Sequence, residues 1–275
     1  MSLSAKPVPL LSKPTDTNSS QETTQILIEA WKLMSGRFPA AAIEEADGVV
    51  SCLANVPLPF FNLVFHNSPL SSPIAMSAFL ETVAARTAAC SHPSMVAVRE
   101  DWVPENWESM TAEAGLGHVM FITGMETDEL LPPRRPMPEL EFRRVASEQT
   151  ARDIAMINAA AYGMPAEMFE CMCNLHIWRE DTYGFVGYQD GKAVTSAATF
   201  LAAGTVYVAL VATQPGLHGK GYAEAVMRHA IGNCRNATGI ARVTLHASDM
   251  GRPLYENMGF RTSSRFSLLA KSSGH

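Results

Sequence analysis

The chain has 275 residues, of which 47% are hydrophobic and 17% are charged, and its formal net charge is −6 at pH 7. Two domains of ordinary size fit this length, and the composition is typical of a globular protein with a sizeable core, which excludes wholesale disorder. A non-specific nucleic-acid binder is disfavoured because neutralising phosphates requires a basic face, so we expect no nucleic-acid partner.

Cysteine usage and the first residues bear on the cellular compartment. Five cysteines, an odd number, do not indicate a disulfide framework, so we expect reduced thiols in a cytoplasmic protein. Residues 1–22 are rich in Ser, Thr, Pro and Lys and lack the apolar core of a signal peptide, which predicts a flexible tail. Residues 193–217 carry no charge, but polar and β-branched residues interrupt them. They predict two buried strands joined at 202–204 rather than a membrane span, so we expect no membrane partner.

The predicted elements alternate between helices and strands, which places the fold in the mixed α/β, or α+β, class. In the first half, residues 23–130, the spacing predicts helices at 23–34, 77–89 and 104–114 and strands at 48–55, 60–66, 94–98 and 118–123. Residues 131–139 contain four prolines, which is typical of a semi-rigid linker. In the second half, residues 140–275, we expect strands at 140–145, 184–188, 193–200, 206–212, 241–246 and 261–268 and helices at 147–161, 166–173, 222–234 and 251–258.

A glycine-rich loop at the start of a helix carries the clearest chemical signal. The segment His218-Gly-Lys-Gly-Tyr-Ala223 follows a buried strand and opens a helix whose apolar residues share one face. Free N–H groups and the helix dipole favour an anion at such an N-terminus. Gly219 and Gly221 let the backbone approach a phosphate, and Lys220 adds positive charge nearby.

The loop also fits a purely structural interpretation, whereas two other phosphate-binding patterns do not match it. A turn that only caps a core helix fits the same residues. The Walker A spacing is absent, and Glu224 stands where the dinucleotide pattern G-x-G-x-x-G needs its last glycine.

The loop resembles motif A of the GNAT superfamily of acyl-CoA-dependent N-acetyltransferases, whose pattern is Q/R-x-x-G-x-G/A after a strand. Residues 218–223 match it except at the first position, where His218 replaces Gln or Arg. Residues 245–261 resemble the GNAT segment in which a tyrosine, here Tyr255, is followed by a short spacer and Gly-Phe. The two motifs stand in the family's order and spacing, and the resemblance covers about residues 139–269.

The resemblance implies two GNAT-like domains, each with a central, mostly antiparallel sheet and flanking helices. Strands splay apart at the acyl-CoA site of the second domain, residues 140–275, which we expect to be catalytic. Residues 23–130 share only the predicted order of elements, and their candidate loop at 66–73 has no glycine and two prolines. We therefore expect a degenerate first domain that binds no CoA.

The resemblance also implies roles for individual residues. The acetyl-CoA thioester would lie between the strands at 206–212 and 241–246, and an amine would attack it directly. Tyr255 would act as general acid toward the CoA thiolate, although a packing role for this tyrosine is the alternative. The pantetheine arm would contact the backbone of Val211, Ala212 and Thr213 and the side chain of Ser248. The pyrophosphate would contact the backbone of His218, Gly219, Lys220, Gly221, Tyr222 and Ala223.

No general base is identified from the sequence, and a chain of water molecules is one route for the proton. Four polar residues lie in the region that often lines the acceptor pocket, but each also fits a surface or structural role: Glu170, His176, Glu180 and Asp181. Cys171 and Cys173 with His176 lack the second ligand pair of a structural zinc site, so we expect no metal. A cysteine nucleophile is disfavoured for want of an identified base.

The sequence therefore predicts an N-acetyltransferase that moves an acetyl group from acetyl-CoA to a primary amine of a small molecule. The alternative is a non-catalytic acyl-CoA-binding or regulatory protein, in which His218 reflects a relaxed site.

Overall fold

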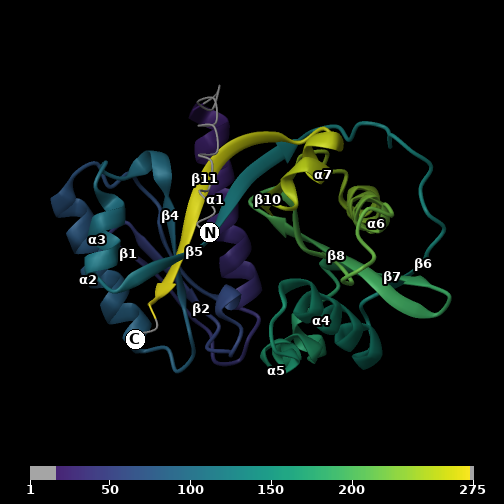
Figure 1. Ribbon diagram of the computed structural model, residues 1–275, viewed down its shortest axis with the longest axis horizontal. Helices are drawn as coiled ribbons and strands as arrows, with labels where there is room; N and C mark the ends of the chain where they lie inside the picture. The colour runs from purple at the N-terminus through teal and green to yellow at the C-terminus, as the bar shows by residue number, and fades with distance from the viewer. Residues whose placement is uncertain (1–16, 273–275) are drawn as a thin grey trace, which may run out of the picture.

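Eleven strands form one mixed sheet that runs through both halves of the chain (Figure 1). The computed structural model describes residues 17–272, so residues 1–16 of the predicted tail lie outside the described residues. The strand order is β1-β2-β3-β4-β11-β5-β10-β9-β8-β7-β6. Neighbouring strands are antiparallel except for β3 with β4 and β9 with β10. The predicted α+β class and the mostly antiparallel pairing are confirmed, with one parallel pair in each half.

The elements of the first half follow the predicted order, with one additional strand at the sheet edge, β1. The helices are α1 (Thr17–Ser35), α2 (Pro73–Ala88) and α3 (Trp107–Glu113). The strands are β1 (Ala42–Ala46), β2 (Val49–Leu53), β3 (Asn62–His66), β4 (Met95–Arg99) and β5 (Leu116–Thr127). All five residues of β1 are exposed, so its composition lacks the apolar alternation by which a half-buried strand is predicted.

The second half contains every predicted strand and helix. Its strands are β6 (Glu141–Arg144), β7 (Thr182–Gln189), β8 (Lys192–Ala202), β9 (Thr205–Thr213), β10 (Val243–Ser248) and β11 (Arg261–Lys271). Its helices are α4 (Glu148–Tyr162), α5 (Ala166–Phe169), α6 (Tyr222–Thr238) and α7 (Arg252–Asn257). The uncharged stretch forms β8 and β9, as predicted, and none of the helices in the described part of the chain is long and apolar enough to cross a membrane.

The last strand of the chain joins the two halves. β11 lies between β4 and β5 of the first half and pairs antiparallel with both. β5 in turn pairs with β10 of the second half. The division at residues 131–139 therefore lies between two halves that share one hydrogen-bonded sheet, and Figure 1 shows β11 beside β5 at its centre.

Helix α1 covers the middle of the sheet and shares a hydrophobic core with both halves. Residues that alternate along the strands face opposite sides, because successive side chains of a strand point to opposite faces. Ala198 and Tyr207 face the core that contains α1 and α4, whereas Ala197 and Val208 face the core that contains α6. A third core lies under α2. The α1 face of the sheet is thus the one on which residues from the two halves meet.

Helix α1 begins at Thr17, so residues 17–22, which the sequence analysis assigns to the tail, belong to the helix. Arg99 at the end of β4 holds this first part of α1. Its guanidinium donates to the backbone oxygen of Ser20 at 3.0 Å and to Thr24 Oγ1 at 2.8 Å, and only 3% of the Arg99 surface is exposed. Residues 17–22 are polar, so their composition does not predict a helix that is held by a contact from a distant strand.

The proline-rich linker takes a long path from the centre of the sheet to its edge. β5 lies at the centre and β6 at the far edge, with β10, β9, β8 and β7 between them. Residues 128–140 contain no helix or strand and cross this distance on the side of α6 (Figure 1). The backbone oxygen of Leu131 accepts from Arg228 on α6 at 2.6 Å. This path brings the linker over the beginning of α6.

Candidate active site

The parallel strands β9 and β10 separate after three paired positions. Their register ends at Val208 opposite Leu245, whereas both strands continue beyond it. The opening coincides with an irregularity in the pairing of β8 with β9 and with Leu210, which has a φ of +55°. A non-glycine residue in the left-handed region costs of order 1–3 kcal/mol, and such strain persists only where its surroundings fix it. The predicted splay between these strands is therefore present.

A buried polar network fixes the backbone at Leu210. Ser196 on β8 donates its Oγ hydrogen to the Leu210 oxygen at 3.0 Å. The amide of Asn158 on α4 donates to Ser196 Oγ at 3.1 Å and to the backbone oxygen of Ile154 at 2.8 Å. Asn158 and Ser196 are fully buried. Because a buried hydrogen bond is costly to leave unmade, this network holds the irregular strand in one conformation.

The glycine-rich loop enters α6 through three glycines in the left-handed region. Gly216, Gly219 and Gly221 have φ values of +80°, +78° and +84°. Gly221 is the N-cap of α6 and provides no side chain to bond the first turn. The first N–H groups of the helix are therefore available to an anion, as the sequence predicts.

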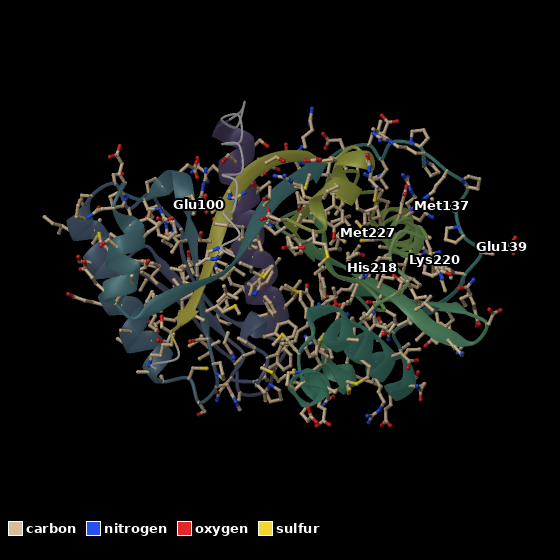
Figure 2. All side chains as sticks on the ribbon, in the orientation of Figure 1. Glu100, Met137, Glu139, His218, Lys220 and Met227 are labelled. Atoms are coloured by element: carbon tan, nitrogen blue, oxygen red, sulfur yellow. The ribbon has the colours of Figure 1, made fainter. Side chains whose placement is uncertain are left out.

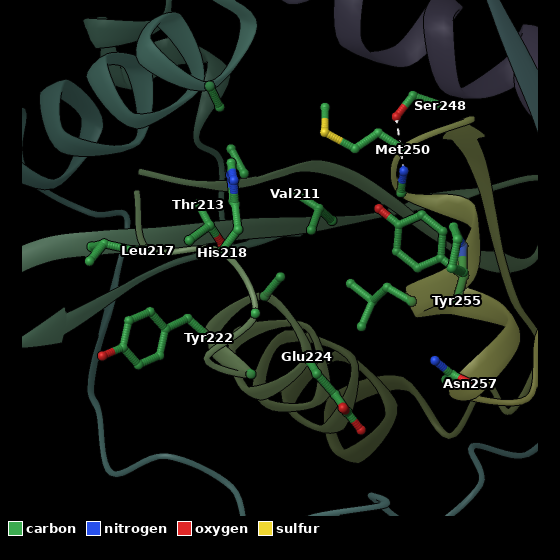
Figure 3. A pocket seen from close by; sticks show the side chains of 18 of the residues that line it. Val211, Thr213, Leu217, His218, Tyr222, Glu224, Ser248, Met250, Tyr255 and Asn257 are labelled. Carbon is green, nitrogen blue, oxygen red and sulfur yellow. Dashed lines mark hydrogen bonds between the residues drawn. The ribbon is translucent and has the colours of Figure 1, made fainter. Parts of the chain in front are cut away.

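The predicted site residues of both motifs line one cavity of about 470 Å³ between this loop and α7 (Figure 3). They are Val211, Ala212, Thr213, His218, Gly219, Gly221, Tyr222, Ala223, Ser248 and Tyr255. Lys220 is the exception. Its side chain, labelled in Figure 2, is exposed, and its ammonium lies 6.0 Å from the centroid of the Tyr222 ring. Lys220 does not line the cavity.

Tyr255 on α7 directs its hydroxyl into the cavity on the side of Val211 (Figure 3). The residue is 8% exposed, and burial raises the pKa of its phenol above the ordinary value. The hydroxyl is protonated at neutral pH, as an ordinary tyrosine is, and the shift makes the phenolate less accessible still. Gly251 makes room for the ring, since a Cβ on it would lie 3.1 Å from a ring carbon of Tyr255. The Gly251 N–H donates to Ser248 Oγ at 3.3 Å, which positions that hydroxyl at the cavity wall.

Arg135 lines the same cavity and was missed by the sequence analysis. Its Nη1 donates to the backbone oxygen of Gly219 at 2.8 Å, and its Nε would lie 3.6 Å from a Cβ on Gly221. A guanidinium from the linker thus lies on the glycine-rich loop. The available signal was the pair Arg134-Arg135 within the prolines, but its destination depends on the path of the linker across the sheet.

The four polar residues considered as bases lie away from this cavity: Glu170, His176, Glu180 and Asp181. Asp181 forms an ion pair with Arg37, with an N–O distance of 2.7 Å. His176 packs edge-on against Phe38. Burial raises the pKa of the Cys171 thiol to about 12, which disfavours a thiolate nucleophile. Within residues 17–272, no group of three or more His, Cys, Asp or Glu side chains is arranged to hold a metal ion.

A second cavity of about 140 Å³, here called the inner chamber, lies on the α1 face of the sheet. It shares the wall residues Tyr162, Val211, Ser248 and Tyr255 with the larger cavity. The rest of its wall comes from both halves of the chain, with Trp31 and Phe60 from the first and Tyr207 and His246 from the second. No sequence motif indicates this chamber, because its walls come from segments that are far apart in the chain.

Comparison with known proteins agrees with this geometry. Residues 146–267 match the family model described as the acetyltransferase (GNAT) domain, which includes the loop, β9, β10 and Tyr255. No curated protein matches the sequence.

Solved structures share the fold over most of the chain. A GCN5-related N-acetyltransferase from Kribbella flavida is 20% identical with a TM-score of 0.67, and the match covers 94% of this chain and 96% of that one. A GCN5-related N-acetyltransferase from Sphaerobacter thermophilus is 17% identical with a TM-score of 0.56 and 94% coverage of both chains. A functionally unknown conserved protein from Staphylococcus epidermidis is 14% identical with a TM-score of 0.62, covering 85% of this chain and 95% of its own. These similarities extend the fold assignment to both halves.

Proposed function

We propose that the protein, whose residues 146–267 match the GNAT acetyltransferase domain, transfers an acetyl group from acetyl-CoA to a primary amine of a small molecule. One observation carries the proposal. The glycine-rich loop, the strand splay and the buried Tyr255 phenol border a single cavity. An anion site, a gap for an extended arm and a proton donor are the three features that acyl transfer from CoA requires.

Acetyl-CoA would be bound along this cavity from the loop to α7. The pyrophosphate lies at the N–H groups of residues 218–223, where the helix dipole favours negative charge. Arg135 supplies a cation beside the loop, where the family pattern has Gln or Arg and this chain has His218, because its guanidinium already lies on Gly219. The pantetheine arm follows the backbone of residues 211–213, with Ser248 beside it.

Transfer requires one bond to form and one to break. The lone pair of the amine attacks the acetyl carbon, and the carbon–sulfur bond breaks as the CoA thiolate departs. Tyr255, whose phenol is protonated at neutral pH, gives its proton to the sulfur. The attacking nitrogen loses one proton and the phenolate regains one, so the products are the amide and the free thiol. Holding the two reactants together supplies much of the rate.

Replacement of the tyrosine tests this role. We expect Tyr255→Phe to lower kcat by about 10² to 10⁴, the usual contribution of a positioned acid, without weakening acetyl-CoA binding. Free thiol release and the mass of the acetylated amine measure turnover, and calorimetry measures binding. Tyr183→Phe is the matched control, because Tyr183 on β7 is half-buried and lies outside both cavities.

Three outcomes would contradict parts of the proposal. Unchanged turnover in Tyr255→Phe removes the acid role. Equal loss in Tyr183→Phe indicates a stability effect. Tight acetyl-CoA binding without acetylation of any amine supports instead a non-catalytic acyl-CoA-binding protein.

A further inference from the structure

The inner chamber opens where the two cavities share their walls. Tyr255, Val211 and Ser248 belong to both, so a molecule in the chamber can present a group to the place where the thioester is proposed to lie. The first half contributes much of the remaining wall, including Trp31, Phe60 and Met120. The first half, whose loop at residues 66–73 has no glycine, therefore helps to form a second binding space.

The wall of the chamber is apolar and carries no formal charge at neutral pH. Among its lining residues in the described part of the chain there is no Asp, Glu, Lys or Arg. Moving an ammonium or a carboxylate into such a space without a counter-ion is costly, because the charge loses its water. The chamber therefore favours an uncharged body over a second charged group.

The volume and the aromatic walls fit a single ring. An apolar protein cavity of about 150 Å³ is known to hold benzene, and the chamber has about 140 Å³. Trp31 and Tyr207 meet edge-to-face with centroids 6.1 Å apart. The Trp31 indole N–H donates to the Phe60 oxygen at 2.6 Å, which fixes the orientation of the indole ring. A planar aromatic ligand could therefore make edge-to-face or offset-stacked contacts with aromatic rings that are already held in place.

Two paired polar groups lie within this apolar wall. Tyr207 Oη lies 3.2 Å from His246 Nδ1. Burial lowers the pKa of His246 to about 3, so the ring is neutral and the pair can accept an N–H hydrogen without adding charge. Both side chains come from the strands that separate beyond Val208 and Leu245, the last paired positions. Tyr207 directly precedes Val208 on β9, and His246 directly follows Leu245 on β10.

We propose that the inner chamber binds the body of the acceptor, and that the acceptor is a primary amine joined by a short chain to one aromatic ring. Its amino group lies toward the mouth formed by Tyr162, Val211, Ser248 and Tyr255. The Tyr207–His246 pair, in the remaining wall of the chamber, can accept a hydrogen bond from the guest without adding charge. This assignment rests on the proposed function and adds to it a substrate class and a role for the first half.

The test compares amines and two bulky substitutions. Steady-state acetylation is measured with 2-phenylethylamine, 1,4-diaminobutane and ethylamine, each at saturating acetyl-CoA. We expect kcat/KM for 2-phenylethylamine to exceed that of the diamine at least tenfold, since burying a second ammonium is penalised. Met120→Trp fills the chamber and should raise KM for 2-phenylethylamine at least tenfold while changing acetyl-CoA affinity less than twofold. Val119→Trp is the control, because the neighbouring Val119 is 46% exposed and does not line the chamber.

Each outcome decides between the two proposals. Preference for the diamine, or an equal effect of both substitutions, overturns the chamber assignment and leaves the acetyltransferase intact. A Met120→Trp variant that loses activity with longer acyl-CoA donors but not with the aromatic amine places the acyl chain in the chamber instead. If no amine is acetylated, calorimetry with 2-phenylethylamine still decides. Binding that Met120→Trp abolishes supports the chamber without the transferase, and no binding to the wild type overturns both.

Discussion

Replacing Arg135 with glutamine is expected to weaken CoA binding without altering the fold. The guanidinium donates to the Gly219 oxygen at 2.8 Å, and its side chain borders the cavity beside the loop. Arg135 is exposed, so its attraction to a pyrophosphate is screened by water. Exposed ion pairs contribute up to about 1 kcal/mol, and a charge-assisted hydrogen bond contributes about 1.5–3 kcal/mol. We take the lower figure, about 1 kcal/mol, which corresponds to an increase of about fivefold in Kd.

Calorimetric titration of CoA into wild type, Arg135→Gln and Arg134→Gln measures this effect. Arg134 is the adjacent residue of the same linker, is exposed, and does not line the cavity. The two variants carry the same change in net charge, so only the position differs. The difference in Kd for CoA between Arg135→Gln and Arg134→Gln should become smaller at high salt, because salt screens exposed charges. Equal affinities of the two variants would refute the reasoning, and Arg135 would then only hold the linker against the loop.

Three further predictions concern turnover, stability and pH. Gly251→Ala should lower kcat with little change in CoA affinity, because the added Cβ would lie 3.1 Å from the ring of Tyr255 and displace it. Steady-state kinetics measures this effect, and an unchanged kcat would contradict the prediction. Ser196→Ala should lower the free energy of unfolding by about 1–3 kcal/mol, since it breaks the network at the splay, and urea denaturation that gives no loss would refute that role. Burial lowers the pKa of His66 to about 4, and its neutral Nε2 accepts the Arg99 N–H at 2.9 Å. The unfolded chain therefore binds this proton more readily, and stability should fall by up to about 3 kcal/mol as the pH drops from about 6.5 to 4. A His66→Gln variant should show a shallower pH dependence of unfolding, and an unchanged dependence would exclude His66 as its source.

The sequence was sufficient to locate the loop and the tyrosine but not the residues that complete the cavity. Glycine spacing before an amphipathic helix is a local signal, and so is the tyrosine before Gly-Phe. The pair Arg134-Arg135 indicates only positive charge within the linker, because the position of Arg135 depends on the linker crossing four strands to reach the sheet edge.

The order of the strands in the sheet could not be predicted from the sequence either. Periodicity predicts that residues 261–268 form a strand but does not say which strands they pair with. Only tertiary structure shows that β11 lies between β4 and β5, and that α1 lies over both halves. For the same reason, Trp31 and His246 could not be assigned to one chamber, since 215 residues separate them along the chain.

Thermal unfolding with and without acetyl-CoA tests most directly whether the loop at residues 218–223 binds the donor. At a ligand concentration near 100 times Kd, binding should stabilise the wild type by about 2.7 kcal/mol. Gly221→Glu should abolish this shift by placing a carboxylate where the pyrophosphate is proposed to lie. Gly239→Glu, at the other end of α6, adds the same charge and a comparable backbone strain at a φ of +73° and should retain the shift. An equal shift in all three proteins would place acetyl-CoA elsewhere, and no shift in the wild type would show that the protein does not bind acetyl-CoA.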